Sequence, residues 1–237
     1  MTFSIQAQKL YEIPPGTIKI NDSLYIDKGP IDNLMYLEFT KNVKKLWNYT
    51  LHDSLKLLEL ENIDKSLLSY SLNSDQNEKI YNEIILAENL KISDSVDINY
   101  YFNYPDYYYH PVIGISKNQA QIFCEWRTDM VNMRWSKELK NDKKEYKKII
   151  YRLPTNEEYI LAKKVFREKD KLLIINENSP LKIDLKNLRN KNNFILYNAS
   201  EYTISDENFK ENSLQINNID QLDSPYTFFR CICELEK

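Results

Sequence analysis

The most regular pattern in the chain is a short apolar stretch, then a polar capping residue, then apolar residues at helical spacing. The pattern occurs twice in the middle of the chain. In each case a Ser or Thr is followed three positions later by Gln or Glu, namely Ser116 with Gln119 and Thr155 with Glu158. This spacing is the capping box, in which two side chains satisfy free amides at a helix N-terminus. The sequence therefore predicts two successive strand-to-helix units.

The first unit is predicted to have a strand at 112–115 and a helix from Lys117 to about Lys140. The second has a short strand around Tyr151 and a helix that starts after Thr155. Helical spacing places the apolar residues of each helix along one side, which we expect to face the core. These residues are Ala120, Phe123, Cys124, Val131 and Trp135 in the first helix, and Tyr159, Ala162, Val165 and Phe166 in the second.

The amino-terminal part predicts a hairpin followed by a helix. Residues 13–20 and 24–27 have the composition of strands, and an Asn-Asp pair supplies the turn between them. Asp32 or Asn33 then caps a helix that runs to about Trp47. The predicted apolar side of this helix consists of Leu34, Leu37, Val43 and Leu46.

The remaining segments complete an α+β pattern. Residues 50–98 contain amphipathic stretches separated by Ser-, Asn- and Asp-rich breaks, which is typical of an insertion between core elements. Residues 167–193 are rich in Lys, Asn and Asp and predict a surface excursion. Two further strands are predicted at 194–197 and at 226–233. We therefore expect one α+β domain over residues 13–237, with an insertion at about 50–98.

Six tyrosines lie within ten residues, which makes this segment a candidate binding face. Tyrosine offers a large contact area at a small cost in conformational entropy, so such a cluster is typical of a ligand or partner surface. A structural interpretation also fits, in which an irregular segment fixes the insertion to the core. The candidate residues are Tyr100, Tyr101, Tyr104, Tyr107, Tyr108 and Tyr109.

Composition excludes several classes of function. The net charge is −3, and Lys and Arg are interleaved with Asp and Glu. The sequence has no basic stripe of the kind that binds nucleic acid, so nucleic-acid binding is not expected. No apolar run approaches the roughly 20 residues that span a bilayer. The chain has only 3 Gly, which excludes the glycine-rich loops that cradle phosphates.

Residues 1–12 are interpreted as a tail outside the domain. The first eight residues are apolar and end in Ala-Gln, which is similar to the last part of an export signal. We expect the native protein to be exported, to the periplasm or the outer-membrane surface. An ordinary frayed terminus is the alternative interpretation.

Three stretches in the two strand-to-helix units resemble a known family. Residues 111–116 read Pro-Val-Ile-Gly-Ile-Ser, 120–126 read Ala-Gln-Ile-Phe-Cys-Glu-Trp, and 152–162 read Arg-Leu-Pro-Thr-Asn-Glu-Glu-Tyr-Ile-Leu-Ala. Together they resemble the signature of the formylglycine-generating-enzyme, or sulfatase-modifying factor, domain family. The resemblance implies the C-type-lectin-like fold of that family, with short mixed strands, packed helices and much irregular structure.

One motif resembles a particular branch of the family. Residues 126–132 read Trp-Arg-Thr-Asp-Met-Val-Asn, which is similar to a stretch in the gliding-motility lipoproteins of the Bacteroidota. Members of that branch are catalytically silent envelope proteins, whereas other branches are oxidases. The question is therefore which residues of the oxidase chemistry are present.

The resemblance also implies a disulfide. In the family, the Cys of the Ala-x-x-Phe-Cys helix commonly pairs with the Cys of the terminal Phe-Arg-Cys strand, and these positions are Cys124 and Cys231. Closing a loop of about 107 residues would restrict the unfolded chain by roughly 4–5 kcal/mol in the entropic model. A pair of reduced, buried thiols is the alternative. Cys233 lies on the same side of the predicted strand and would compete for the bond.

The residues of the oxidase chemistry are missing. The oxidases of the family bind copper(I) through two further thiolates on an Arg-Gly-Gly-Ser-Trp segment shortly before the final strand. Residues 207–226 contain no Cys, Gly, Trp or Arg, and Cys233 alone cannot supply two soft ligands. A second branch holds iron through histidines, but His52 and His110 are the only two in the chain. We therefore predict that the chain is not an enzyme.

A calcium site of the family is partly represented. Its Gly-Asn-Val-Trp-Glu-Trp-Thr motif corresponds to Tyr197-Asn-Ala-Ser-Glu-Tyr-Thr203. Asn198 and Glu201 carry hard oxygen donors, and the Ala199 carbonyl would join them. The alternative is that Glu201 makes hydrogen bonds to a loop backbone. We therefore expect no cofactor, with calcium as the one candidate.

These observations favour a non-catalytic structural or interaction protein of the bacterial cell envelope, an accessory subunit of a secretion, gliding or outer-membrane complex. Its expected partners are other envelope proteins. The alternative is a glycan- or peptide-binding module that uses the Tyr100–Tyr109 segment, and a copper-dependent oxidase is the third.

Overall fold

The computed structural model describes the parts of the chain that form the core. These are residues 13–42, 91–93, 95–138, 148–175, 181, 193–197, 199–205, 209–210 and 227–236. The tail 1–12 and most of the insertion predicted at 50–98 lie outside them, so those two predictions stay predictions. The described parts combine helices with short strands, in agreement with the α+β prediction.

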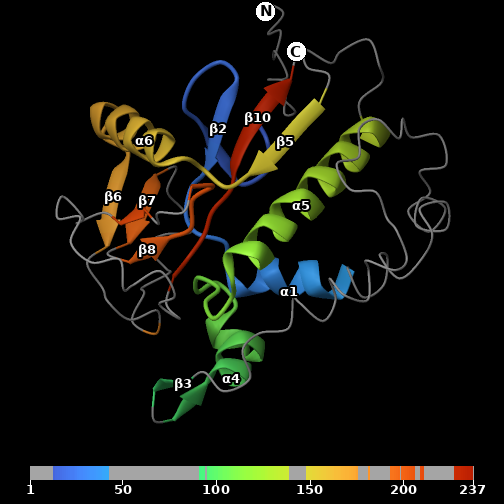
Figure 1. The fold of residues 1–237 in the computed structure, drawn as a ribbon, viewed down its shortest axis with the longest axis vertical. Coiled ribbons are helices and arrows are strands. Elements are labelled where there is room, and N and C mark those ends of the chain that lie inside the picture. The colour runs from blue at the N-terminus through green and yellow to red at the C-terminus, as the bar shows by residue number, and fades with distance from the viewer. Residues whose placement is uncertain are drawn as a thin grey trace, which may run out of the picture.

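A four-stranded antiparallel sheet lies at one end of the molecule (Figure 1). Its strands are β1 (Thr17–Lys19), β2 (Leu24–Asp27), β10 (Ile232–Glu236) and β5 (Lys148–Arg152), in the order β1-β2-β10-β5. The last strand of the chain therefore lies in the middle of the sheet. It joins the amino-terminal hairpin to the strand that precedes the second capping box.

The predicted hairpin is confirmed. Thr17 of β1 is opposite Asp27 of β2, and the side chain of Asn21 accepts hydrogen bonds from the amides of Ser23 and Leu24. An Asn side chain that bonds to backbone two and three residues later stabilises a tight turn.

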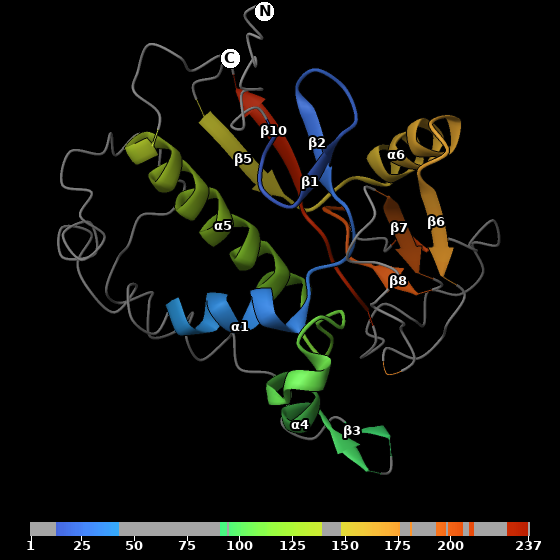
Figure 2. The same cartoon turned by 180° about the vertical axis from the view of Figure 1, so that it is seen from behind.

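Helix α5 (Lys117–Glu138) lies diagonally beside β5, and its predicted N-terminus is confirmed (Figures 1 and 2). The Ser116 amide donates to the side chain of Gln119 at 2.6 Å, and the Gln119 amide donates to Ser116 Oγ at 3.2 Å. All five residues of its predicted inner side are buried, namely Ala120, Phe123, Cys124, Val131 and Trp135.

Helix α1 (Asn33–Asn42) crosses one end of α5, with an inner side that differs from the prediction. Asp32 is its cap, since its Oδ1 accepts from the Met35 amide at 2.8 Å. Of the predicted inner residues, Leu37 is half-buried against the core, as expected, whereas Leu34 is 36 % exposed. Tyr36 and Phe39 are fully buried instead. Tyr36 stacks on Phe123 of α5 at a centroid distance of 6.0 Å, and Phe39 meets the same ring edge to face at 5.4 Å. Aromatic packing rather than the Leu spacing therefore decides which side faces inward. Val43 and Leu46 lie outside the described residues.

The strand predicted at 112–115 is wrong, although the residues are buried. Pro111 forms a single bridge with Asp32, and Gly114 has φ +72°. The Val112 amide donates to the Ile31 carbonyl, and no ladder continues beyond it. A positive φ turns the backbone away from the extended path, so this apolar run enters the core without a strand partner.

Helix α6 (Asn156–Glu168) covers a second, smaller core on the other side of the sheet (Figure 2). It packs with a parallel pair of strands, β6 (Leu172–Ile175) and β7 (Phe194–Tyr197). Strand β7 was predicted and is confirmed. Strand β6 falls inside the predicted surface excursion 167–193, so that prediction is wrong for these four residues.

The last strand begins at Ile232, six residues later than predicted. Before it, the carbonyls of Phe228, Phe229 and Cys231 accept from Tyr202, Ile31 and Asp27 respectively. Because their backbone groups bond in turn to residues 200–202 and to residues 27–31, residues 227–231 pass through the core without forming a regular ladder.

The short elements complete the description. They are β3 (Lys91–Ser93), β4 (Val96–Asp97), α4 (Ile98–Asn103), a 3₁₀ turn at Pro105–Tyr107, β8 (Ser200–Glu201) and β9 (Phe209–Lys210). Among the described helices, none is long and apolar enough to cross a bilayer.

Candidate functional site

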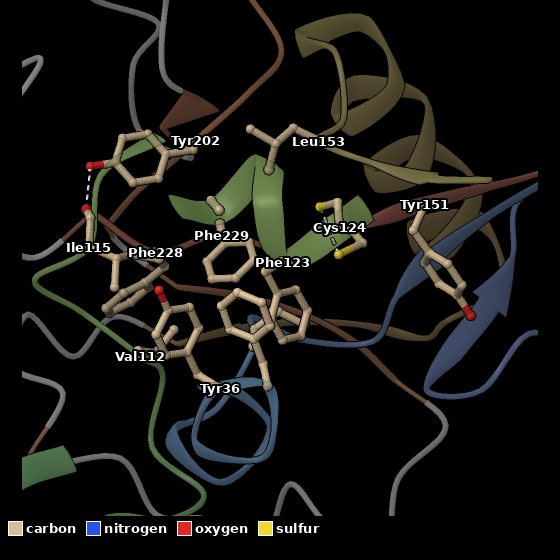
Figure 3. Packing of buried hydrophobic residues seen from close by; sticks show 14 of the residues in the cluster. Tyr36, Val112, Ile115, Phe123, Cys124, Tyr151, Leu153, Tyr202, Phe228 and Phe229 are labelled. Carbon is tan, nitrogen blue, oxygen red and sulfur yellow. Dashed lines mark hydrogen bonds between the residues drawn. The ribbon is translucent and has the colours of Figure 1, made fainter. Parts of the chain in front are cut away.

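The cysteines that the resemblance pairs are brought together in the core. Cys124 on α5 and Cys231 before β10 have their sulfurs 3.1 Å apart. Figure 3 shows Cys124 in the same buried cluster as the rings of Phe123 and Phe229. Both cysteines are buried, and they are thiols in contact, since a covalent bond requires about 2.05 Å. Burial raises the pKa of Cys124 well above its ordinary value, and the hydrogen bond with Cys231 adds to this. The disulfide itself stays a prediction.

The third cysteine is buried in the same region. Cys233 lies on β10 opposite Tyr151 of β5. Burial raises its pKa well above the ordinary value, so its neutral thiol is the favoured form. All three cysteines of the chain are therefore interior side chains.

A buried ion pair ties α5 to the hairpin. Arg127 donates to both carboxylate oxygens of Asp27, at 2.7 and 2.8 Å, and to the carbonyl of Pro15 at 2.7 Å. Its guanidinium also lies 4.3 Å above the ring of Tyr151. Burial alone would lower the pKa of Arg127, but the Asp27 charge outweighs it and raises that pKa. Gly16, with φ +78°, leaves the guanidinium room, because a Cβ there would meet it at 3.0 Å.

A second buried ion pair joins the segment before β10 to β8. Arg230 donates from Nη2 to Glu201 Oε1 at 2.6 Å and from Nε to Oε2 at 2.7 Å, and both side chains are almost fully buried. The hydroxyl of Tyr159 donates to the same Oε2 at 2.8 Å. Arg230 also bonds to the carbonyl of Ile195 at 2.8 Å. This network fixes α6, β7, β8 and the terminal segment to one another.

Glu201 does not have the surroundings of a calcium ligand. Its two carboxylate oxygens accept from Arg230 and Tyr159, so a guanidinium neutralises the charge that a cation would need. The alternative expectation, that Glu201 bonds to a loop backbone, is also wrong, because its carboxylate accepts from the side chains of Arg230 and Tyr159. Ala199 is half-buried and Asn198 lies outside the described residues. In the described part of the chain, no three His, Cys, Asp or Glu side chains gather as a metal site.

Two polar residues of α5 act as partners for the outer edge of β5. The side chain of Asn132 donates to the Ile149 carbonyl at 2.8 Å and accepts from the Ile149 amide at 3.1 Å. One turn earlier, Thr128 Oγ1 accepts from the Tyr151 amide at 2.8 Å. Thr128 and Asn132 are four residues apart on the helix, and their partners Tyr151 and Ile149 are two residues apart on the strand. The helix therefore satisfies backbone groups at the sheet edge that a fifth strand would otherwise bind.

The tyrosine segment divides into a buried and an exposed part. Tyr101 is fully buried and donates to the Pro111 carbonyl at 2.7 Å, so its assignment to a partner face is wrong. Tyr107 and Tyr108 are half-buried. Three rings remain open to solvent, namely Tyr100 at 44 %, Tyr104 at 41 % and Tyr109 at 41 %.

Helix α1 holds this segment in place. The side chain of Asn33 donates to the carbonyls of Tyr101 and Tyr107, and the Leu34 amide donates to the Tyr108 carbonyl at 2.7 Å. His110 is buried against the rings of Tyr101 and Tyr107. The segment thus contacts the core on one side and exposes rings on the other. The insertion that it was expected to hold lies mostly outside the described residues, so both sequence interpretations stay predictions. His52 lies outside the described residues.

The two arginine networks were not predicted from the sequence. One signal was present, because Arg127, Thr128 and Asn132 fall on the buried side of a helix among apolar residues. Buried polar side chains are hydrogen-bonded as a rule, so their positions call for internal partners. The identity of those partners, such as Asp27 at a separation of 100 residues, has no local signal.

Comparison with known proteins gives a single finding. A family model described as the sulfatase-modifying factor enzyme 1-like domain matches residues 2–219. A search of curated proteins gave no match, and a search of solved structures gave none either.

Proposed function

The chain belongs to the sulfatase-modifying factor enzyme 1-like family, and we propose that it is a non-catalytic member that serves as an interaction protein. The burial of every cysteine in the chain is the observation that supports this proposal. The chain has 3 Cys, and all three are buried at the contact between α5 and the terminal segment. The C-type-lectin-like arrangement expected for the family is part of the same proposal.

Copper(I) chemistry requires soft thiolate ligands that are free to bind the metal. Cys124 and Cys231 are in contact with each other, and Cys233 is fully buried on β10, opposite Tyr151 of β5. The raised pKa values of Cys124 and Cys233 favour the neutral thiol, which is a poor ligand. Residues 207–226, which correspond to the oxidase segment, contain no Cys.

The bacterial envelope is the proposed location, with a secretion, gliding or outer-membrane complex as the assembly. Support comes from the resemblance of residues 126–132 to gliding-motility lipoproteins and from the expected disulfide, which needs an oxidising compartment. The same motif also has structural roles, since Arg127, Thr128 and Asn132 all bond within the core. The retained core and the missing thiolates support a non-catalytic role. The support that residues 126–132 give to the gliding-motility branch is weaker.

The proposal is tested by affinity purification of the full chain from envelope fractions of its native cells after mild cross-linking. We expect one or a few envelope proteins in stoichiometric amounts. Recovery of the bare monomer, with the same background as an unrelated exported domain, would argue against an interaction role.

A binding module for a peptide or glycan is the second candidate. The exposed rings of Tyr100, Tyr104 and Tyr109 favour it, because aromatic rings held on an ordered backbone are typical of recognition surfaces. A copper-dependent oxidase is the third candidate, and the distribution of the cysteines speaks against it.

A further inference from the structure

Three tyrosine rings form a continuous aromatic surface at the end of the molecule that carries α4, and we call Tyr100, Tyr104 and Tyr107 the tyrosine cluster. The rings of Tyr100 and Tyr104 stack with centroids 4.5 Å apart and planes at 18°. Tyr107 meets Tyr100 at 6.1 Å and 67°, and Tyr104 at 6.4 Å and 49°. The cluster therefore presents ring faces in two directions rather than a single flat patch.

The backbone beneath the cluster is ordered by hydrogen bonds. The Tyr104 amide donates to the Tyr100 carbonyl at 2.9 Å, and the Tyr107 amide donates to the Tyr104 carbonyl at 3.0 Å. Asn33 holds the Tyr107 carbonyl at 2.9 Å, and the Asp97 side chain caps α4 through the Tyr100 amide at 2.7 Å. A ligand would meet rings whose positions are already fixed, which reduces the entropy lost on binding.

The segment that carries the cluster is acidic. Residues 95–116 contain Asp97 and Asp106 and no Lys or Arg. Both carboxylate side chains belong to exposed residues, and Asp106 directly precedes Tyr107 in the 3₁₀ turn. Lys91 of β3 lies opposite Asp97 of β4, and Asp106 is therefore the carboxylate relevant to the cluster. Partial desolvation and a hydrogen bond with Tyr104 raise the pKa of Tyr100, and the charge of Asp106 acts in the same direction, which places this carboxylate near the rings.

We infer that the tyrosine cluster binds an arginine-bearing, extended segment of a partner protein. The inference rests on the proposed interaction role and names the chemistry of its partner. A guanidinium stacks on the face of a tyrosine ring through cation–π attraction, and a carboxylate beside the ring holds its charge. Complementary charge also directs the approach of the partner, so binding should weaken as salt is raised.

The same surface favours a neutral glycan less than it favours an arginine-bearing segment. The hydroxyls of a sugar would also donate to a carboxylate, but a neutral sugar gains no charge attraction from Asp106. A guanidinium uses the rings and the charge together. The calcium-binding Glu-Pro-Asn and Gln-Pro-Asp motifs of sugar-binding lectins are also absent from the sequence.

The test is calorimetric titration of the full chain with a defined probe, the capped peptide Gly-Arg-Ser-Arg-Ser-Arg-Gly. Its control replaces each Arg by citrulline, which keeps the shape and removes the charge, and a neutral chitotetraose is titrated in parallel. We expect saturable binding of the arginine peptide, at least tenfold weaker binding of the citrulline peptide, and severalfold weaker binding when salt rises from 50 to 200 mM, all as order-of-magnitude values.

Variants assign the binding to the cluster. Tyr104→Ala should weaken the arginine peptide about tenfold, whereas Tyr104→Phe, which keeps the ring, should stay within about threefold. Tyr109→Ala is the matched control, because Tyr109 is as exposed as Tyr104 at 41 % and lies outside the cluster. Asp106→Asn should reduce both the affinity and its dependence on salt. Circular dichroism of each variant confirms that it is folded.

Equal binding of the arginine and citrulline peptides, preferred binding of the saccharide, or no binding of the arginine peptide would each overturn the inference. So would an affinity that Tyr104→Ala leaves unchanged. None of these outcomes alters the recovery of partners from envelope fractions, which tests the interaction role separately. A stoichiometric partner whose recovery survives Tyr104→Ala would keep the proposed function and place its interface elsewhere.

Discussion

At the scale of single residues, two arginines carry charge into the interior, and each meets a carboxylate there. Arg127 joins α5 to the hairpin through Asp27, and Arg230 joins the terminal segment to β8 through Glu201. A buried ion pair gives little net stability compared with apolar residues of the same shape, but removal of one partner leaves an uncompensated charge. These pairs therefore specify which segments meet.

Replacement of Arg230 by Met should destabilise the protein strongly. The change leaves Glu201 buried without its cation, so we expect the free energy of unfolding to fall by about 3–5 kcal/mol. Urea unfolding measures the effect, and the double variant Arg230→Met with Glu201→Gln should recover part of the loss. Lys19→Ala, which removes an exposed ion pair with Asp22, is the control and should cost under about 1 kcal/mol. A similar loss of unfolding free energy for Arg230→Met and for Lys19→Ala would contradict this role of the buried ion pair.

The state of Cys124 and Cys231 is a second question at this scale. Their sulfurs lie 3.1 Å apart, so a small movement suffices to join them when an oxidant is present. We expect intact-mass analysis of protein from an oxidising compartment, alkylated without reductant, to show one thiol modified after unfolding, that of Cys233. Alkylation at all three cysteines would show that the pair stays reduced.

At the scale of elements, α5 connects most parts of the fold. One side of this helix contacts α1 through aromatic rings, and Cys124 on it contacts Cys231. Thr128 and Asn132 bind the open edge of β5, so the sheet needs no further strand there. The helix thus replaces a strand at the point where an exposed edge would invite association with another chain.

Asn132→Ala tests this replacement. The variant leaves the amide and carbonyl of Ile149 buried without these partners, at a cost of about 1–3 kcal/mol each. We expect the free energy of unfolding to fall by about 2–4 kcal/mol and the Ile149 amide to exchange faster with solvent. The control is Asn103→Ala, whose side chain makes one exposed bond within α4, and it should cost about 0.5 kcal/mol or less. Unchanged exchange at Ile149 would contradict the proposed edge role.

Elements with local signals could be predicted, and elements defined by distant partners could not. Both capping boxes and the hairpin turn were correct because each is specified within about four residues. The apolar run 112–115 carried the same signal as a strand but lacks a partner beyond one bridge. Strand β6 was missed because the Lys- and Asn-rich residues around it outweighed four apolar ones, and its partner β7 begins about twenty residues later.

The candidate sites show the same limit. The meeting of Cys124 with Cys231 was expected from the family resemblance, since no property of the two residues alone connects them across 107 positions. The six tyrosines were recognised as a group, but their division into buried and exposed members depends on α4, whose turns place Tyr101 inward and Tyr100 outward. Glu201 was assigned to calcium from its match to the family motif at 197–203. Its actual partner Arg230, 29 residues later, gave no local signal.

At the scale of the whole molecule, the buried ion pair with Arg230 balances the charge of Glu201, which is the candidate calcium ligand. We therefore expect the melting temperature to change by less than about 1 °C when 5 mM EDTA replaces 2 mM calcium at constant ionic strength. Differential scanning calorimetry of the full chain measures this. A calcium-dependent rise of several degrees would show a site that the Glu201–Arg230 contact does not predict, and Glu201→Gln would then show whether Glu201 belongs to it.

The proposed non-catalytic role requires that no cysteine of this family member is available for copper. The most direct measurement is a competition titration of the fully reduced full chain with a chromophoric copper(I) chelator such as bathocuproine disulfonate. We predict that the chelator retains all of the copper, as it does with a variant in which all three cysteines are replaced by Ala. Transfer of one equivalent of copper(I) to the native chain and not to that variant would contradict the assignment of a non-catalytic role.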